Sequence, residues 1–324
     1  MSGAWPGARK PAMNSGDGRF LIVGAGLIGG AVFRRLSRVG RSVAGLATRP
    51  GPCTTVCADL ATEDGRRTLA CLAGADGVAA VVLCHGPSDV TACEDAPRAT
   101  REIHEQAAAG VIGHGVPVLL VSTDNVFPGM PVRHRAGDPR RPVNAYGRAK
   151  AAAEDVVLAD PGGSVLRVSL VYGPGGRSGH RPDYVRRCMA RLRAGEYVDA
   201  PVDQTCTPVH VDDVTTVIAA LLLAPPPLRY RLRHLAGSQM VSRVELAMLA
   251  ARAVGASAGL VRPVAREGSA LACRPRYSAL ASGPFDDVPA LAGFQAGLLE
   301  DHFGDLARWT SRQRTHPAGG DFAE

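Results

Sequence analysis

A short apolar run that enters a glycine turn and continues into a helix constrains this 324-residue chain most strongly. Phe20–Val23 is followed at once by Gly24–Gly29, whose first, third and sixth residues are glycines, in the spacing G-x-G-x-x-G. The first glycine of such a turn allows the tight bend, the second lets the backbone approach a pyrophosphate, and the third allows helix and strand to pack closely. Amide groups at the helix start favour an anion. The pattern therefore predicts a dinucleotide-binding α/β sheet. The expected cofactor contacts in this turn are Gly24, Gly26, Leu27, Ile28 and Gly29.

The residues after the next strand bear on the choice between NAD and NADP. An NAD site usually places an acid about 20 residues beyond the glycines, where it binds the ribose 2′-hydroxyl. Residues 20–57 contain no Asp or Glu, and the second expected strand ends at Thr48 and Arg49. Because a guanidinium pairs well with a 2′-phosphate, we predict NADP(H) as cofactor, bound in part by Thr48 and Arg49. Asp59 either faces the adenine or caps the segment that follows it.

Strand-like and helix-like segments alternate through the first half of the chain, which predicts a Rossmann-like, doubly wound parallel sheet. Beyond Tyr172 the pattern becomes less regular, so we expect a smaller C-terminal substrate-binding domain. The expected strands are 20–23, 42–47, 78–84 and 116–122, and the expected helices are 94–110, 184–193, 209–223 and 242–254. The expected division is a disordered leader (1–18), an NADP-binding Rossmann domain (19–174 plus about 203–224), a substrate domain (about 175–202 and 225–310) and a loose tail (311–324).

Composition excludes several classes of protein. Hydrophobic residues make up 46% of the chain and charged residues 21%, which is typical of a globular protein with a sizeable core. The longest apolar stretch, Val217–Ala224, is far below the ~20 residues that span a bilayer, and residues 1–18 lack the apolar segment of a secretory signal. Eight cysteines include no C-x-x-C pair, which indicates free thiols in a reducing cytoplasm and no metal site. The net charge is +7, but aromatics are only 5%, so we expect a small anionic ligand rather than nucleic acid.

Tyr146 and Lys150 stand four residues apart, so a helix places both on one face. A hydride delivered to a carbonyl carbon leaves an alkoxide that must gain a proton, and Tyr146 is predicted to donate it. The neighbouring ammonium is expected to lower the pKa of the tyrosine and to bond ribose hydroxyls of the cofactor. Of 37 basic residues 35 are arginine, and the other lysine is Lys10. The alternative interpretation is a chance pair on a solvated helix.

At this point the chain resembles the extended short-chain dehydrogenase/reductases, and within them dTDP-4-dehydrorhamnose reductases and related keto-sugar reductases. The resemblance covers about residues 20–300 and rests on the ordered blocks VSTDNVFPG, PVNAYGRAK, LRVSLVYG, VDQTCTPVHVDD and RPRYSAL. It implies NADPH-dependent reduction of a sugar keto group, with Thr123 as the catalytic hydroxyl, Tyr146 as the acid and Lys150 as its cation. Thr123 also stands at the carboxyl end of an apolar strand, where ligands of such sheets bind. A keto-sugar is the expected partner, and a homodimer is left open.

Three positions depart from the pattern of this family. Asn125 stands where the family has a tyrosine facing the sugar, and Ala136 replaces a glutamate, while Asp138 matches. His104 aligns with an asparagine that organises a proton relay in many relatives. A histidine titrates near neutrality, so His104 is either a relay or a helix-packing residue. The resemblance assigns substrate contacts to Asp124, Asn125, Gln204 and His104.

Two rival functions remain at this stage. A 4,6-dehydratase on the same fold carries Thr-Asp-Glu, and the amide of Asn125 cannot serve as that acid or base; a sugar epimerase is a further alternative. A non-catalytic, NAD(P)-binding regulatory subunit would not need an intact Thr123, Tyr146 and Lys150. The substrate is either a nucleotide-linked keto-deoxysugar or a keto-aminosugar intermediate of antibiotic biosynthesis, such as an aminoglycoside. Arginines that could hold a nucleotide diphosphate are Arg181, Arg186, Arg187, Arg191 and Arg193.

Overall fold

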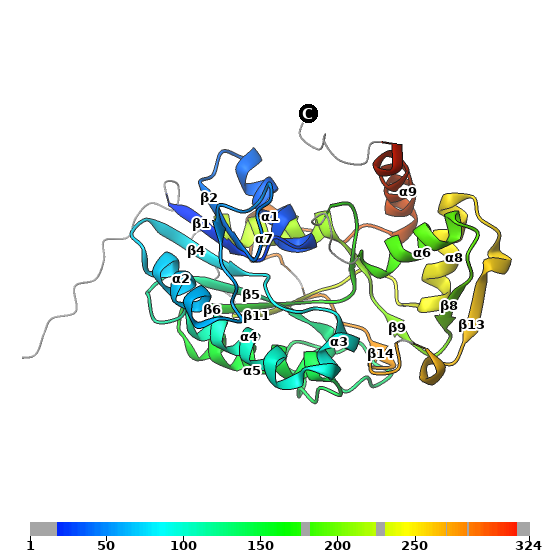
Figure 1. Ribbon diagram of the computed structural model, residues 1–324, viewed down its shortest axis with the longest axis horizontal. Coiled ribbons are helices and arrows are strands. Elements are labelled where there is room, and N and C mark those ends of the chain that lie inside the picture. The colour runs from blue at the N-terminus through cyan, green and yellow to red at the C-terminus, as the bar shows by residue number, and fades with distance from the viewer. Residues whose placement is uncertain (1–17, 176–181, 225–230, 270, 284, 316–324) are drawn as a thin grey trace, which may run out of the picture.

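The larger of two lobes is built on a seven-stranded parallel sheet (Figure 1). The computed structural model describes residues 18–175, 182–224, 231–269, 271–283 and 285–315. The strands of the sheet are β1 (Arg19–Val23), β2 (Val43–Ala47), β3 (Val56–Cys57), β4 (Val78–Leu83), β5 (Val118–Thr123), β6 (Gly163–Val168) and β11 (Leu232–Leu235). They lie in the order β11-β6-β5-β4-β1-β2-β3, so the chain runs outward in both directions from the β1–β4 pair. The expected Rossmann-like, doubly wound sheet is confirmed.

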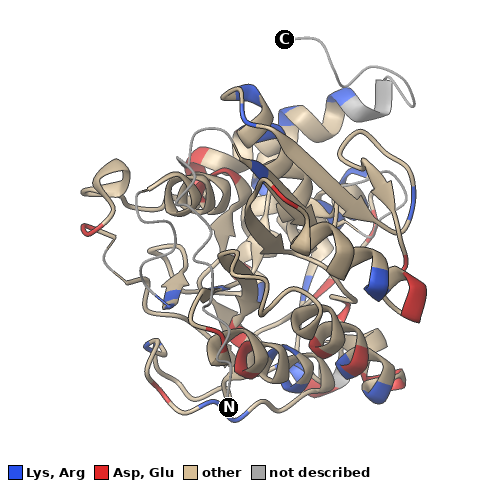
Figure 2. Cartoon of the chain, turned by 90° about the vertical axis from the view of Figure 1, so that its left-hand side faces the viewer, with Lys and Arg blue, Asp and Glu red and all other residues tan. Residues whose placement is uncertain are grey.

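Helices cover both faces of the sheet, which explains why its central strands are apolar on both sides. On one face α1 (Leu27–Arg38) and α7 (Val211–Leu223) pack over one hydrophobic core. On the other face α2 (Glu63–Gly74), α4 (Pro97–Ala109) and α5 (Ala145–Ala159) enclose a second core. The short helix α3 (Val90–Asp95) and the 3₁₀ turn η1 (Asp124–Val126) follow the carboxyl ends of β4 and β5. Figure 2 shows basic and acidic residues interspersed on the helices at the bottom of its view.

The smaller lobe lies beside the carboxyl edge of this sheet (Figure 1). Its helices α6 (Tyr184–Arg193), α8 (Arg243–Val254) and α9 (Leu299–Thr315) share a core of their own. Its strands pair as β8 (Val198–Pro201) with β13 (Val261–Val264), and as β9 (Thr205–Cys206) between β12 (Val241–Ser242) and β14 (Tyr277–Ser278). The pair β7 (Val171–Tyr172) and β10 (Val209–His210) leads between the lobes. Further 3₁₀ turns are η2 (Ala258–Leu260), η3 (Arg266–Gly268) and η4 (Pro289–Leu291).

Several expected boundaries differ from the structure. The helix expected at 94–110 is two helices, α3 and α4, because the chain bends at Ala96 and Pro97 starts α4. The expected helix 209–223 begins with two strand residues, β10. The loose tail expected at 311–324 is helical as far as Thr315, while residues 316–324, like 1–17 of the expected leader, lie outside the described part.

The expected division between the domains also needs adjustment. The expected substrate domain includes 225–310, yet β11 pairs with β6 and forms an edge of the central sheet. Conversely, the expected Rossmann domain includes β9, yet β9 pairs with β12 and β14. Residues Phe285, Val288 and Leu291 pack into the core beneath α1 and α7. The chain therefore crosses between the lobes more often than the sequence pattern indicates.

All eight cysteines are unpaired thiols. Among the described residues, no helix is both long enough and apolar enough to cross a membrane. Within the same ranges, no group of three or more His, Cys, Asp or Glu side chains is placed to hold a metal ion.

Candidate active site

A cleft of ≈ 570 Å³ runs along the carboxyl edge of the sheet and continues against the smaller lobe. It lies where the strand order reverses, between β1 and β4, which is the place where open α/β sheets bind ligands. Its volume falls within the range of ordinary ligand sites. Most of the expected site residues line it. They are Gly24, Gly26, Leu27, Ile28, Thr48, Asp59, Thr123, Asp124, Asn125, Tyr146, Lys150 and Gln204.

The glycine turn forms one end of this cleft. Gly24 has a φ of 99°, a conformation that favours glycine. A Cβ on Gly29 would lie 1.9 Å from the carbonyl oxygen of Gly24, so this glycine allows β1 and α1 to pack. A Cβ on Gly26 would meet nothing within 4 Å, and Gly26 caps α1 without a side-chain hydrogen bond. The backbone at Gly26 thus borders open space at a helix N-terminus, which fits the pyrophosphate of a dinucleotide.

Thr48 and Asp59 lie in the same wall beyond the turn, where an adenosine would extend. The Oδ1 of Asp59 accepts a hydrogen bond of 3.0 Å from the amide of Ala61. Asp59 therefore caps the segment that follows it and also borders the cleft. Its contact with the adenine stays a prediction. Arg49 is exposed and stands outside the cleft lining, next to Thr48. Its pairing with a 2′-phosphate stays a prediction.

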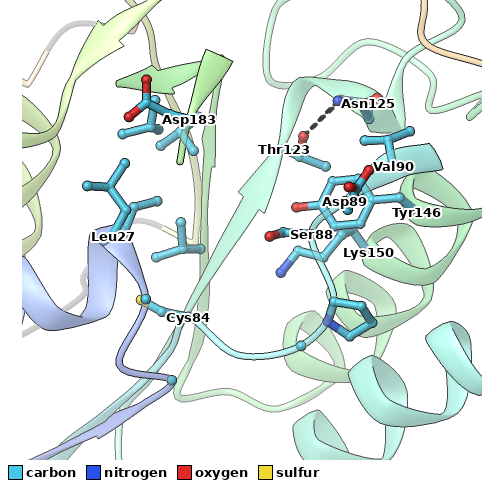
Figure 3. A pocket seen from close by; sticks show the side chains of 18 of the residues that line it. Leu27, Cys84, Ser88, Asp89, Val90, Thr123, Asn125, Tyr146, Lys150 and Asp183 are labelled. Carbon is cyan, nitrogen blue, oxygen red and sulfur yellow. Dashed lines mark hydrogen bonds between the residues drawn. The ribbon is translucent and has the colours of Figure 1, made fainter. Parts of the chain in front are cut away.

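Thr123 is the last residue of β5, and its side chain lines the cleft (Figure 3). The Thr123 hydroxyl donates to Oδ1 of Asp124 at 3.1 Å and accepts from Nδ2 of Asn125 at 3.1 Å. The amide oxygen of Asn125 in turn accepts from Nδ2 of Asn144 at 2.9 Å. Asn125 therefore holds the threonine hydroxyl as well as lining the cleft, a role that the sequence does not indicate.

Tyr146 and Lys150 project into the cleft from the first turns of α5 (Figure 3). Asn144 caps this helix, because its Oδ1 accepts from the amide of Gly147 at 2.7 Å. The Thr123 side chain lowers the pKa of Tyr146, against the larger effect of burial, and both residues line the cleft. The structure thus brings the three expected catalytic residues together on one wall, opposite Leu27 and Cys84.

The electrostatics of the pair differ from the expectation. Burial, followed by the charge of Asp124, raises the pKa of Tyr146 above its ordinary value. The expected lowering by a cation is therefore wrong for this state, because desolvation of a phenolate dominates. Burial also lowers the pKa of Lys150 to about 8, against the opposing effects of Cys84 and Glu154. Tyr146 is consequently a protonated hydroxyl near neutrality, as a proton donor must be.

A buried ion pair fixes α5 one turn beyond Lys150. The carboxylate of Glu154 accepts from Nε of Arg167 at 2.9 Å and from its Nη2 at 2.7 Å. The hydroxyl of Ser122, beside Thr123 in β5, donates to the same carboxylate at 2.5 Å. Since Glu154 and Arg167 are almost fully buried, this network holds α5 against β5 and β6 in one register.

His104 does not lie where a substrate contact would be. It is 1% exposed, stands outside the cleft lining and packs its ring 6.0 Å from that of Tyr146. Its Nε2 lies 3.1 Å from the carbonyl oxygen of Pro87. Burial and then the charge of Lys150 lower the pKa of His104 well below its ordinary value. The expectation of titration near neutrality is therefore wrong, and His104 is a neutral, helix-packing residue behind the tyrosine.

Asp124 and Gln204 lie in the cleft wall as expected, but protein groups already engage both. Asp124 Oδ2 accepts from the hydroxyl of Ser169 at 2.8 Å, and burial raises the pKa of Asp124. Gln204 donates to the carbonyl of Pro275 at 3.3 Å and accepts from Nε of Arg243 at 3.1 Å. Both residues therefore shape the substrate end of the site through their neighbours.

Ala136, the remaining departure from the family pattern, and Asp138, which matches that pattern, both lie outside the cleft lining. The carbonyl oxygen of Ala136 accepts from Nη1 of Arg167 at 3.0 Å. Asp138 Oδ2 accepts from the amide of Arg135 at 2.8 Å. The loss of the family's glutamate at Ala136 therefore does not alter the cleft wall directly.

The arginines predicted to hold a diphosphate separate into two groups. Arg186 and Arg187, on α6, line the cleft. Arg191 pairs with Glu196 at 3.1 Å, and Arg193 donates to the hydroxyl of Thr310, so these two face away from it. Arg181 lies outside the described residues.

Sequence reasoning missed several residues of the lining. The most notable are His85 and Cys84, directly after β4, and Arg243 and Arg274 from the smaller lobe. His85 follows an apolar strand just as Thr123 does, and this position could have drawn attention to it. No comparable signal exists for Arg243, because a first-turn arginine of a helix is ordinarily exposed.

Comparison with known proteins agrees with this geometry. A profile of the RmlD substrate binding domain family matches residues 18–291. The chain belongs to this family. It is 30% identical over 296 residues to the probable low-salt glycan biosynthesis reductase Agl14 of Haloferax volcanii, covering 88% of this chain and 96% of that protein. It is 30% identical to a dTDP-4-dehydrorhamnose reductase of Mycolicibacterium smegmatis, covering 82% and 78%.

A solved structure shares the fold of this RmlD-family chain. The dTDP-4-dehydrorhamnose reductase of Bacillus anthracis, crystallised with NADP, superposes with a TM-score of 0.75 at 21% identity, covering 90% of this chain and 98% of that one. The resemblance read from the sequence and the expected fold class are thus confirmed. The expected enzyme class, an oxidoreductase, agrees with the relatives named as reductases.

Proposed function

We propose that this RmlD-family protein reduces a keto group of a sugar, with NADPH as the reductant. The observation that carries the proposal is the meeting of Thr123, Tyr146 and Lys150 on one wall of a cleft that ends at an open glycine turn. When bound, NADPH supplies a hydride to the carbonyl carbon. The backbone around Gly26 would hold its pyrophosphate, and Thr48 and Arg49 its adenosine end.

Three side chains of the protein would stabilise the developing charge and supply the proton that the reaction requires. Thr123 and Tyr146 present hydroxyls to the carbonyl oxygen, where negative charge develops. Tyr146, protonated near neutrality, gives up its proton to that oxygen. Lys150 stabilises the tyrosinate left behind, because an ammonium beside it favours the charged form. The buried setting strengthens each of these interactions.

The names of the relatives favour a nucleotide-linked keto-deoxysugar as substrate, since the Mycolicibacterium protein is named for a dTDP-linked sugar. A keto-aminosugar intermediate of antibiotic biosynthesis is the second form to be tested. The unpaired thiols favour a reducing compartment, and we place the protein in the cytoplasm. Asn125 disfavours dehydration or epimerisation, since its amide can neither take up nor release a proton.

NADPH consumption at 340 nm tests the proposal directly. The purified protein is given a dTDP-linked 4-keto-deoxysugar and, separately, a free keto-aminosugar. We expect turnover with one of them, and a loss of about 100-fold or more in kcat for Tyr146→Phe. Tyr197→Phe is the matched control, because Tyr197 is exposed and lies outside the cleft lining. Binding of NADPH without reduction of any keto-sugar would instead favour the regulatory-subunit alternative.

A further inference from the structure

Arg243 stands in the wall of the cleft that the smaller lobe provides, as the first residue of α8. It is only 6% exposed. Its Nε donates to Oε1 of Gln204 at 3.1 Å, and its guanidinium carbon lies 4.7 Å from the ring centroid of Tyr184. Its backbone amide and carbonyl bond the same two residues, at 3.0 Å and 3.3 Å. The side chain is therefore held in one position.

The far end of this guanidinium has no protein partner. Nη1 of Arg243 is buried and forms no hydrogen bond, and none of the ion pairs among the described residues includes Arg243. A guanidinium cannot lose its charge in a protein, and a buried cation without a counter-ion is strongly unfavourable. Such a group in a ligand cleft indicates that the missing partner is supplied by the ligand.

Asp124, the acid of the cleft lining whose pKa Arg243 affects, does not supply that partner. The charge of Arg243 acts on Asp124 and lowers its pKa, against the larger effect of burial. The oxygens of Asp124, however, already accept from Ser169 at 2.8 Å, Thr123 at 3.1 Å and Asn125 at 2.8 Å. Asp124 therefore belongs to the threonine network, and Arg243 remains without an anion.

Two other arginines of the cleft lining each have a carboxylate nearby. Arg186 pairs with Asp183 at 2.5 Å, and Arg274 lies 3.7 Å from a carboxylate oxygen of Asp89. Arg243 differs from both by lacking a carboxylate. Its position near Gln204 and Asp124 places it at the sugar end of the cleft rather than at the glycine turn.

We propose that Arg243 binds an oxyanion of the substrate, a phosphoryl or carboxylate oxygen, through its guanidinium. The residue thereby selects an anionic keto-sugar over a neutral or cationic one. Hydrogen bonds between an arginine and an oxyanion are short and strong, and they gain further strength where water is excluded. A protonated aminosugar would instead meet a fixed positive charge. This inference rests on the proposed function, because it concerns the substrate of that same site.

Calorimetric titration of protein saturated with NADP⁺ tests the inference without turnover. Saturation fills the cofactor end, so an added anion can bind only in the substrate half. The probes are dTDP for a phosphoryl group and glucuronic acid for a carboxylate. We expect at least one to bind, and Arg243→Gln to weaken its affinity about 10- to 100-fold. A loss confined to dTDP identifies the phosphoryl group, and a loss confined to glucuronic acid identifies the carboxylate.

Two further variants separate anion binding from a structural role. Arg252→Gln removes an exposed arginine of the same helix, and its affinities should equal those of the wild type. Arg243→Lys keeps the charge but loses the planar donor fork, so it should recover part of the affinity lost in Arg243→Gln. An unchanged melting temperature and NADP⁺ affinity show that each variant is folded, and Arg243→Lys alone decides the matter where Arg243→Gln does not fold.

The inference is overturned if neither probe binds the wild type, or if folded Arg243 variants bind both probes as tightly as the wild type. Its failure is distinguishable from that of the proposed function. Keto-sugar reduction that is indifferent to Arg243 removes this inference alone. Arg243-dependent binding of dTDP in a protein that reduces no keto-sugar removes the reductase proposal alone.

Discussion

At the scale of single residues, burial of the Lys150 ammonium destabilises the folded protein. Lys150 is 3% exposed and its pKa is lowered from 10.5 to about 8, chiefly by burial. Below pH 8 the folded and unfolded chains both hold this proton, and the folded chain keeps a buried charge. Between pH 8 and 10.5 only the unfolded chain holds it, so this group makes stability rise with pH in that window.

Lys150→Met should therefore stabilise the cofactor-free protein at pH 7, by roughly 3 kcal/mol. The advantage should shrink as pH rises from 8 toward 10, because the wild-type lysine is then neutral when folded. Urea unfolding of both proteins across pH 7–10 measures the difference, which cancels other titrating groups such as Tyr146. A variant less stable than the wild type at pH 7 would show that the lysine is a net structural contributor.

Replacement of Lys150 should impair catalysis, although it is expected to stabilise the cofactor-free protein. Lys150→Arg keeps a positive charge, but the guanidinium is wider, planar and directional, and the pocket around Lys150 is buried. A displacement of ~1 Å can cost about 100-fold in rate, so we expect a loss of that order in kcat with cofactor affinity largely retained. Steady-state NADPH oxidation and fluorescence titration of NADPH measure the two quantities. Near wild-type turnover by this variant would remove Lys150 from the mechanism.

At the scale of elements, two glycines of the turn between β1 and α1 have different expected roles. Gly29 allows the strand and the helix to pack, and Gly26 leaves space for the cofactor. A Cβ at position 29 would lie 1.9 Å from the carbonyl oxygen of Gly24, whereas one at position 26 would meet nothing. Gly29→Ala should therefore lower the melting temperature, because strand and helix must move apart. Gly26→Ala should leave it nearly unchanged and weaken NADPH binding at least tenfold, because the added methyl group fills the space left for the pyrophosphate.

The two measurements, thermal unfolding and NADPH titration, make each variant the control for the other. Equal cofactor affinity in Gly26→Ala and the wild type would argue against the pyrophosphate lying at this turn. A Gly29→Ala protein as stable as the wild type would show that β1 and α1 can separate without cost.

What the sequence predicts at this scale depends on how apolar each element is. The strands β1, β4 and β5 are continuous apolar runs, and their approximate positions could be read directly. In contrast, β11 has the sequence LRHL, and its buried Arg233 and His234 conceal a strand of the sheet. The break between α3 and α4 depends on a local bend at Ala96, and the spacing of the apolar residues does not indicate this bend.

In the candidate site, the sequence predicts the positions of side chains better than the effects of burial on them. Motif spacing predicted Thr123, Tyr146 and Lys150, because strand ends and helical periods determine where such side chains lie. It did not predict the direction of the Tyr146 pKa shift or the neutrality of His104, since both follow from burial by residues distant in the chain. Arg243 was missed for the same reason.

At the scale of the whole molecule, the cofactor should stabilise the complete chain, because it binds the folded state and not the unfolded one. At a concentration of 100 times Kd, a ligand adds about 2.7 kcal/mol, or several degrees in melting temperature for a chain of this length. We expect NADP⁺ to raise the melting temperature more than NAD⁺ at equal concentration, since Arg49 stands where an acid would select NAD.

Arg49→Ala should remove the difference between the two cofactors by lowering the effect of NADP⁺ alone, because only NADP⁺ carries the 2′-phosphate. The side chain of Arg49 is exposed, so the stability of the free protein should change little. Arg38→Ala, which removes an exposed arginine at the end of α1 outside the cleft lining, serves as the control. Differential scanning fluorimetry with each cofactor, followed by kcat/KM for NADPH and NADH, measures both effects. Equal shifts with the two cofactors in the wild type, or an NADP⁺ effect untouched by Arg49→Ala, would show that the preference is absent or lies in another residue of the adenosine wall.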